Sequence, residues 1–366
     1  MEKLTELEIL LRPAGGGVHL VSTGKDAQLE LQKQIYKVDT EEDVCKGFVA
    51  NLKKIKDAKC VILGLPSDVG AGFVRGANMG PREIRLATLR NHPRFSAAMN
   101  EQGIYDIGDV FVVPQLLHDE MLSDSQLKKT RDALYQGGEA LPVSPLSIAE
   151  RALDLVLAIN PNVVPIVLGG DHSCAWPLTS ALAKQRKDRW SIVQSDAHTD
   201  LLSERLGVKY CFATWSYHAN EIFGRDGRLV QVGIRASGKE KKHWESTLGV
   251  KQLWAADVLS NPKESIDDVL RHLKDLNATS VYFSNDIDGT CSRFADATGT
   301  PEPGGLEPDW LIELIRRLGS EIGICAGDVM EVAPPLASGQ KTEDLAAKYM
   351  VETIAAALQI PLLDDC

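Results

Sequence analysis

Long apolar segments are missing from this sequence of 366 residues. We find no uninterrupted apolar run of about 18 residues, the length that a membrane-spanning helix needs, so we expect no membrane span. The opening segment, residues 1–6, also lacks the basic-then-apolar layout of a signal peptide. We therefore expect a cytoplasmic protein.

Positive charge is also scarce, because 40 Lys and Arg stand against 51 Asp and Glu and give a formal net charge of −11. An acidic surface repels phosphates and anionic lipid headgroups. We therefore expect neither nucleic acid nor a membrane as a partner, and a small cationic substrate suits this charge better.

Cysteine pairs are absent too. The seven cysteines are scattered, and none has the spacing of a zinc knuckle or of a redox CxxC motif. Reduced thiols in the cytosol fit this pattern best.

Short apolar runs alternate with amphipathic stretches along most of the chain. The runs predict strands at 60–64, 163–168, 191–194, 229–234, 281–283 and 322–326. The stretches between them, and one near each end, predict helices at 27–36, 147–159, 266–276, 309–318 and 344–358. This alternation indicates a parallel sheet covered on both faces. Pro165 is tolerable if its strand begins there. We divide the chain into an N-terminal extension, residues 1–55, and one catalytic domain, residues 56–366.

Acidic residues and histidines follow three of these runs directly. They are His172 after the second run, Asp196, His198 and Asp200 after the third, and Asp286 and Asp288 after the fifth. Residues i, i+2 and i+4 of an extended chain point the same way, and ligands bind at the carboxyl ends of parallel strands. We therefore expect these six side chains to share one crevice.

Four carboxylates in one crevice repel each other, and their desolvation costs several kcal/mol per ion. No run of Arg or Lys lies nearby to compensate. Two divalent cations would neutralise the cluster, and oxygen with imidazole ligands suits manganese, nickel or zinc. A lone Asp-x-Asp is usually a turn. Three such motifs, each behind a strand, favour a metal site.

From about Lys59 to Leu358 the sequence resembles the ureohydrolase family of arginases and agmatinases. The motifs that carry the resemblance lie at 75–76, 80–85, 106–109, 169–173, 196–200, 284–305 (which ends in GTPEPGG) and 327–334. The resemblance implies a three-layer α/β/α sandwich with a mostly parallel central sheet, in a homotrimer or homohexamer. It also implies two Mn²⁺ ions, with Ni²⁺ as an alternative, held by all six residues named above.

The family's reaction would be hydrolysis of a guanidino compound to urea and an amine, by water activated between the two ions. Asp200 would hold that water and move its proton, and Glu331 would pair with the guanidinium group of the substrate. The nearest expected activity is that of an agmatinase. Guanidinobutyrate, guanidinopropionate, formiminoglutamate and guanidine itself stay open.

The sequence departs from the family at two places. Phe212 stands where relatives carry a proton-shuttling histidine, and His218 is a possible substitute with an ordinary structural role as its alternative. Cys291 stands where relatives carry an aspartate before proline. The loop after Asp200 does not resemble the one that holds an amino-acid head group in arginases, so L-arginine is not the expected substrate.

Two other functions compete with this one. A metal-binding but catalytically weak homologue, with a regulatory or assembly role, would fit the loss of the shuttle histidine. A deacetylase-like hydrolase on the same fold would use a single zinc, so metal stoichiometry separates it from the first reading.

Overall fold

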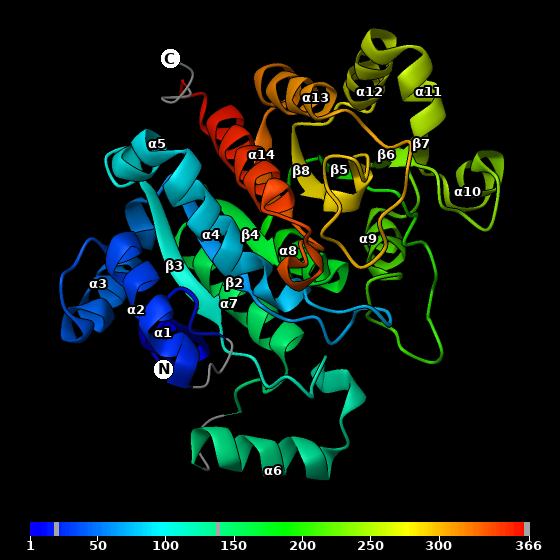
Figure 1. Ribbon diagram of the computed structural model, residues 1–366. Helices are drawn as coiled ribbons and strands as arrows, with labels where there is room; N and C mark the ends of the chain where they lie inside the picture. Colours follow the sequence, from blue (N-terminus) through cyan, green and yellow to red (C-terminus); the bar gives the residue numbers. More distant parts are fainter. Residues whose placement is uncertain (18–21, 137–139, 362–366) are drawn as a thin grey trace.

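The computed structural model describes residues 1–17, 22–136 and 140–361. One nine-stranded sheet forms its centre, in the order β1-β3-β2-β4-β9-β8-β5-β6-β7 (Figure 1). Every neighbouring pair is parallel except β1 with β3. The strands are β1 Leu11–Arg12, β2 Cys60–Leu65, β3 Ile104–Val110, β4 Val164–Gly169, β5 Trp190–Ser195, β6 Leu229–Ile234, β7 Lys251–Trp254, β8 Ser280–Asn285 and β9 Ile324–Val329.

Two hydrophobic cores cover the two faces of this sheet, because successive strand residues point to opposite sides. Val61 and Leu63 of β2 belong to one core, and Ile62 between them belongs to the other. The first core holds α1 Lys3–Leu10, α3 Glu41–Lys54, α7 Pro145–Ile159, α8 Ala175–Gln185 and α9 Trp215–Phe223. The second holds α4 Gly80–Asn91, α5 Pro93–Ala98, α11 Ala255–Ser260, α12 Pro262–Asp275, α13 Pro308–Glu321 and α14 Lys341–Leu358. The predicted three-layer α/β/α sandwich is confirmed.

The strand order matters for function. The strands β4, β9, β8 and β5 are consecutive in the sheet although they are far apart in the sequence. Three of them precede the predicted metal motifs, and β9 precedes Glu331. The carboxyl ends of four adjacent strands therefore deliver these side chains to one edge of the sheet.

Three strands were not foreseen in the sequence. β3 carries Asp106 and Asp109, which break its apolar pattern; both are buried and paired with the guanidinium group of Arg85, at 2.7 and 2.5 Å. β1 and β7 are short edge strands. β9 begins at Ile324 rather than 322, and Pro165 is the second residue of β4, just before pairing with β9 begins at Ile166.

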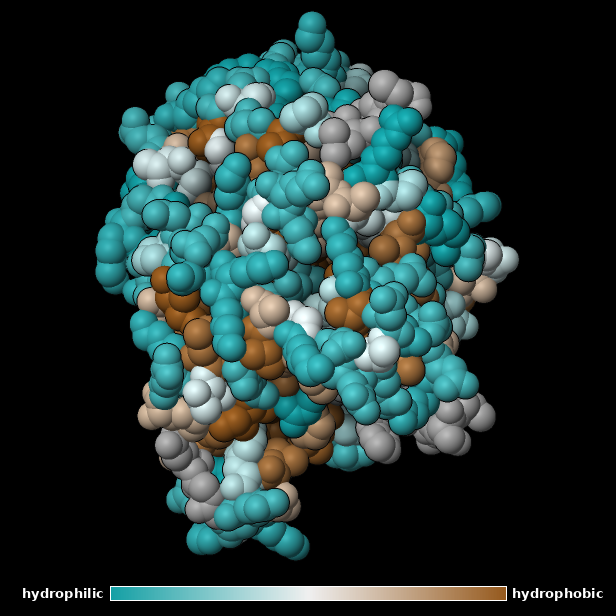
Figure 2. All heavy atoms as spheres, turned by 90° about the vertical axis from the view of Figure 1, so that its left-hand side faces the viewer, coloured by the Kyte–Doolittle hydropathy of each residue, from teal (hydrophilic) through white to brown (hydrophobic). Residues whose placement is uncertain are grey.

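Residues 1–55 join the sheet and its first core. Besides α1, β1 and α3 they form α2 Ser22–Tyr36, and the face that carries α2, α3 and α5 is largely hydrophilic with hydrophobic side chains showing between (Figure 2). Asp124–Tyr135 forms α6, which projects from the body and buries none of its residues (Figure 1). The remaining helix is α10, Lys241–Leu248. In the part of the chain that the structure describes, no helix is both long and apolar enough to cross a membrane.

Candidate metal centre and active site

His172 is surrounded by three carboxylates. It opens a short 3-10 helix, η4 His172–Cys174, directly after β4, and Asp171 caps this helix by accepting a hydrogen bond from the N–H of Ser173 at 2.9 Å. Nδ1 of the His172 imidazole lies 3.1 Å from one carboxylate oxygen of each of three residues, Asp196, Asp200 and Asp286. Its side chain is only 1% exposed. One nitrogen thus faces three acidic oxygens in the interior.

A second group adjoins the first. Nδ1 of His198 lies 3.1 Å from Oδ2 of Asp288 and 3.6 Å from Oδ1 of Asp196. Asp196 faces His172 with Oδ2 and His198 with Oδ1, so its carboxylate is shared by both groups. Each group, His172 with Asp196 and Asp200 and His198 with Asp196 and Asp288, has the spacing of a metal site. The structure therefore brings all six predicted ligands into two adjacent clusters joined by Asp196.

The His172 ring is oriented by a chain of hydrogen bonds from the sheet. Nε2 of His172 lies 3.1 Å from Oγ of Ser284, which donates its hydroxyl hydrogen to Asp328 at 2.9 Å. Asp328 also accepts from the hydroxyl of Tyr282 and from the N–H of Asn285. Because Ser284 has one hydrogen to give, its oxygen accepts Nε2–H of His172, and Nδ1 is left with a lone pair.

This lone pair is the test of whether a metal fits. Among the described residues, Nδ1 of His172 has no hydrogen-bond partner in good geometry, although it is buried. Buried polar atoms rarely lack a hydrogen-bond partner. An unprotonated imidazole nitrogen aimed at three carboxylate oxygens is a suitable donor set for a divalent transition metal. The residues present fit the two ions that the resemblance implies.

The electrostatics of the cluster agree with this. Burial opposes the charged form of His172, but the three carboxylates outweigh burial and raise its pKa well above the usual range. His198 is likewise opposed by burial, and Asp196 with Asp288 raises its pKa to about 12. Burial and the charge of Asp196 raise the pKa of Asp200 to about 7. The carboxylates thus favour positive charge at the centre, which a proton on an imidazole nitrogen or a metal ion in its place can supply.

Asp200 and Glu331 both have left-handed backbones, with φ of +51° and +60°. Such angles are uncommon in non-glycine residues, and strained backbone is often found at functional sites. The indole N–H of Trp215 donates to Oδ2 of Asp200 at 3.1 Å, and Oε1 of Glu331 accepts from the N–H of His172 at 2.8 Å. Glu331 is only 8% exposed, so it is not an ordinary surface glutamate.

His218 is not brought to this cluster. Its Nε2 lies 3.0 Å from the carbonyl oxygen of Lys209, and its ring is in edge contact with Trp176, Tyr210 and Tyr217. No contact between His218 and the six candidate ligands is found among the described residues. Its surroundings therefore favour the structural alternative over proton transfer.

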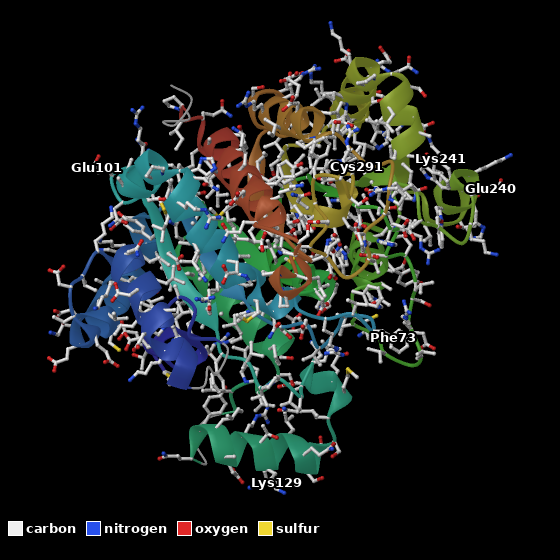
Figure 3. The ribbon with its side chains drawn as sticks, in the orientation of Figure 1. Phe73, Glu101, Lys129, Glu240, Lys241 and Cys291 are labelled. Atoms are coloured by element: carbon white, nitrogen blue, oxygen red, sulfur yellow. The ribbon has the colours of Figure 1, made fainter. Side chains whose placement is uncertain are left out.

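The two departures from the family pattern lie close to the centre. The N–H of Phe212 donates to the carbonyl of Gly70 at 3.1 Å, and Gly70 lies against Ser173, next to His172. Cys291, which is labelled in Figure 3, comes three residues after Asp288. Its N–H donates to the carbonyl oxygen of Leu306 at 3.0 Å. Phe212 therefore adjoins the site with a ring that carries no transferable proton.

Three supporting residues were missed in the sequence: Ser284, Asp328 and Trp215. Ser284 and Asp328 lie inside the motifs at 284–305 and 327–334, so they were visible but had no assigned role. Trp215 follows Asp200 by fifteen residues, and no local pattern links the two.

Comparison with known proteins gives one consistent answer. The profile of the arginase family matches residues 58–356. The chain is 27% identical to an agmatinase of Bacillus cereus over 318 residues, which are 84% of this chain and 95% of the relative. It is 28% identical to a guanidinobutyrase of Pseudomonas aeruginosa over 300 residues, 80% of this chain and 84% of the relative. The solved proclavaminate amidinohydrolase of Streptomyces clavuligerus superposes with a TM-score of 0.66 at 25% identity, over 83% of this chain and 93% of that one.

Proposed function

The chain belongs to the arginase family of hydrolases, and from this premise we propose that it is a binuclear-metal amidinohydrolase that releases urea and an amine from a guanidino compound. The observation that carries the proposal is the shared carboxylate of Asp196, which joins two imidazole-carboxylate groups into one centre. Some relatives are named agmatinases and another a guanidinobutyrase, so their names leave the substrate open.

We propose that His172, Asp196, Asp200 and Asp286 surround one ion and that His198, Asp196 and Asp288 surround the other. When bound, the two ions supply an activated water and stabilise negative charge as it develops. Manganese is the expected metal, with nickel as the alternative. A homotrimer or homohexamer and a cytoplasmic location also remain predictions.

The chain's own residues supply orientation and proton transfer. The carboxylate of Glu331 is fixed beside His172 and pairs with the planar guanidinium group, a contact strengthened by charge. Asp200, held by Trp215, receives the proton of the attacking water and passes it on. Since Phe212 cannot give a proton to the leaving amine, this task falls to Asp200.

The proposal is tested by measuring urea release from a panel of guanidino compounds, using protein loaded with Mn²⁺ or Ni²⁺ and assayed for metal content. Two ions per chain and release of urea are expected. Two bound ions without turnover of any compound would favour the catalytically weak homologue. A single zinc ion would favour the deacetylase-like alternative.

A further inference from the structure

A cavity of about 440 Å³ opens beside the metal centre. Its walls come from the loop after β2, from residues 117 and 121, and from the segment 205–212. Gly70 and Phe212 line the cavity and share a backbone hydrogen bond. Gly70 also lies against η4, because a Cβ on Gly70 would lie 2.4 Å from Oγ of Ser173. The cavity is therefore placed to receive the part of a substrate that extends beyond its guanidinium group.

The charge of this cavity is opposite to that of the whole chain. Its described lining holds two charged residues, Arg75 and Arg205, and no Asp or Glu, whereas the chain carries a net charge of −11. Arg75 donates to the carbonyl of Asp68 at 2.8 Å and lies 3.8 Å from its carboxylate. Arg205 takes part in no ion pair that the structure describes; its guanidinium lies over the ring of Phe212, 4.8 Å from the ring centre. One cation at this wall is thus without a carboxylate.

Arg205 is presented by a tight hairpin. Its backbone exchanges two hydrogen bonds with Val208, at 3.0 and 2.9 Å, across Leu206 and Gly207. Both tip residues have a positive φ, +51° and +78°, as a two-residue turn of this kind requires. Such a turn fixes the backbone at Arg205, and the contact with the Phe212 ring places its guanidinium group at the cavity wall.

The remainder of the wall is apolar. Leu117, Met121, Val208 and Phe212 line the cavity. Leu206 and Phe73 line it as well and are 94% and 98% exposed; Phe73 is labelled in Figure 3. Exposed apolar side chains gathered at a cavity mark a binding surface. Methylene groups suit such walls, but a second positive charge there would face two arginines.

We propose that Arg205 binds a carboxylate at the far end of the substrate, so that the preferred substrate is an unbranched ω-guanidino acid rather than the dicationic agmatine. This inference rests on the proposed function and names the substrate class of the same site. Arg205 sets specificity and does not take part in bond making. The proposed substrate is therefore a zwitterion, in place of the small cationic substrate that the composition led us to expect.

The test compares three substrates that share a guanidinium group and differ at the other end: 4-guanidinobutyrate, agmatine and butylguanidine. Manganese-loaded wild type is assayed beside Arg205→Ala and Arg205→Glu. The control is Arg271→Ala on α12, which removes an exposed arginine that does not line the cavity. We expect Arg205→Ala to raise KM for 4-guanidinobutyrate about 10- to 100-fold, the loss of one charge-assisted hydrogen bond, with kcat little changed. Neither alanine variant should change kcat/KM for butylguanidine, which has no charge at its other end. Arg205→Glu should raise kcat/KM for agmatine.

Two results would overturn the inference alone: a wild-type preference for agmatine, or an equal effect of Arg205→Ala on all three substrates. No urea from any substrate with both ions bound would overturn the proposed function and this inference with it. Because Arg205 lies on a surface hairpin, the variants should fold, and unchanged thermal unfolding of each variant verifies this.

Discussion

Glu331 accepts a hydrogen bond of 2.8 Å from the backbone N–H of His172, so the residue proposed to hold the substrate is fastened to a residue proposed to hold a metal. The two come from the ends of neighbouring strands, β9 and β4. The backbone N–H of Glu331 donates to the carbonyl oxygen of Gly170, also at 2.8 Å. The proposed substrate-binding carboxylate and the proposed metal ligand are thus positioned by the same short stretch of backbone.

Glu331→Gln removes the negative charge from this contact but keeps the shape. We expect kcat/KM for every guanidino substrate to fall about 10- to 100-fold, because an ion pair with two carboxylate oxygens becomes a hydrogen bond to one neutral amide oxygen. Metal content should stay at two ions per chain. Steady-state kinetics with metal analysis tests this, with Glu313→Gln on the exposed side of α13 as the control. Loss of metal in Glu331→Gln would contradict the assignment.

Ser284→Ala removes the acceptor of Nε2–H of His172 and should lower metal affinity. Outer partners of ligating histidines typically contribute about 10- to 100-fold to affinity. Competition with a metal-binding dye measures the change, and Ser320→Ala on α13 is the control. An unaltered metal affinity would show that the hydrogen bond between Ser284 and His172 does not determine which ring nitrogen of His172 is free to bind the metal.

Phe212→His should raise kcat, because it restores a proton donor for the leaving amine. General acid catalysis contributes on the order of 10²–10⁴-fold, which is the ceiling for the gain. Phe212→Leu removes the ring without adding a donor and is the matched control. Equal rates for both variants would contradict the prediction and would mean that a histidine at position 212 adds nothing to the proton donation proposed for Asp200.

His218→Gln should leave kcat unchanged within error, since the His218 ring is held among aromatic residues and at the Lys209 carbonyl. Glutamine can still donate to that carbonyl. The measurement is urea release under saturating substrate. A fall of about 100-fold would restore the proton-transfer role considered for His218.

Metal removal should make stability depend more steeply on pH. In the metal-free protein the pKa of Asp200 is raised from 3.8 to about 7, so the folded state binds this proton more tightly than the unfolded chain. This group then favours folding below pH 4, and the benefit is lost as pH rises toward 7. We expect the gap in Tm between manganese-loaded and EDTA-treated protein to widen from pH 5 to pH 7.5. A constant gap would contradict the prediction.

The six candidate ligands could be expected in one crevice because each motif is local and follows an apolar run. The sequence could show that Asp196, His198 and Asp200 point to one side, since that depends only on the alternation of an extended chain. The local pattern alone could not show that Asp196 belongs to both groups, because this depends on β9 and β8 lying between β4 and β5.

Two further features could not be predicted, because they too depend on residues that are far apart in the sequence. β3 was missed because the buried aspartates in it are compensated by Arg85, 21 and 24 residues earlier in the chain. The role of Arg205 was hidden as well, since a single arginine in a polar loop gives no sign of the cavity beside it. Tertiary contacts decided both.

The position of β9 has a consequence for biosynthesis. This strand is the last of the sheet in the chain, yet it lies between β4 and β8, and Glu331 follows it directly. While the ribosome is still making residues 324–329, β4 and β8 cannot yet be joined through their common neighbour. Non-local pairing of this kind is slow and comes late in folding. The nascent chain therefore carries all six candidate ligands before its last strand can bring the residue after β4 together with those after β5 and β8.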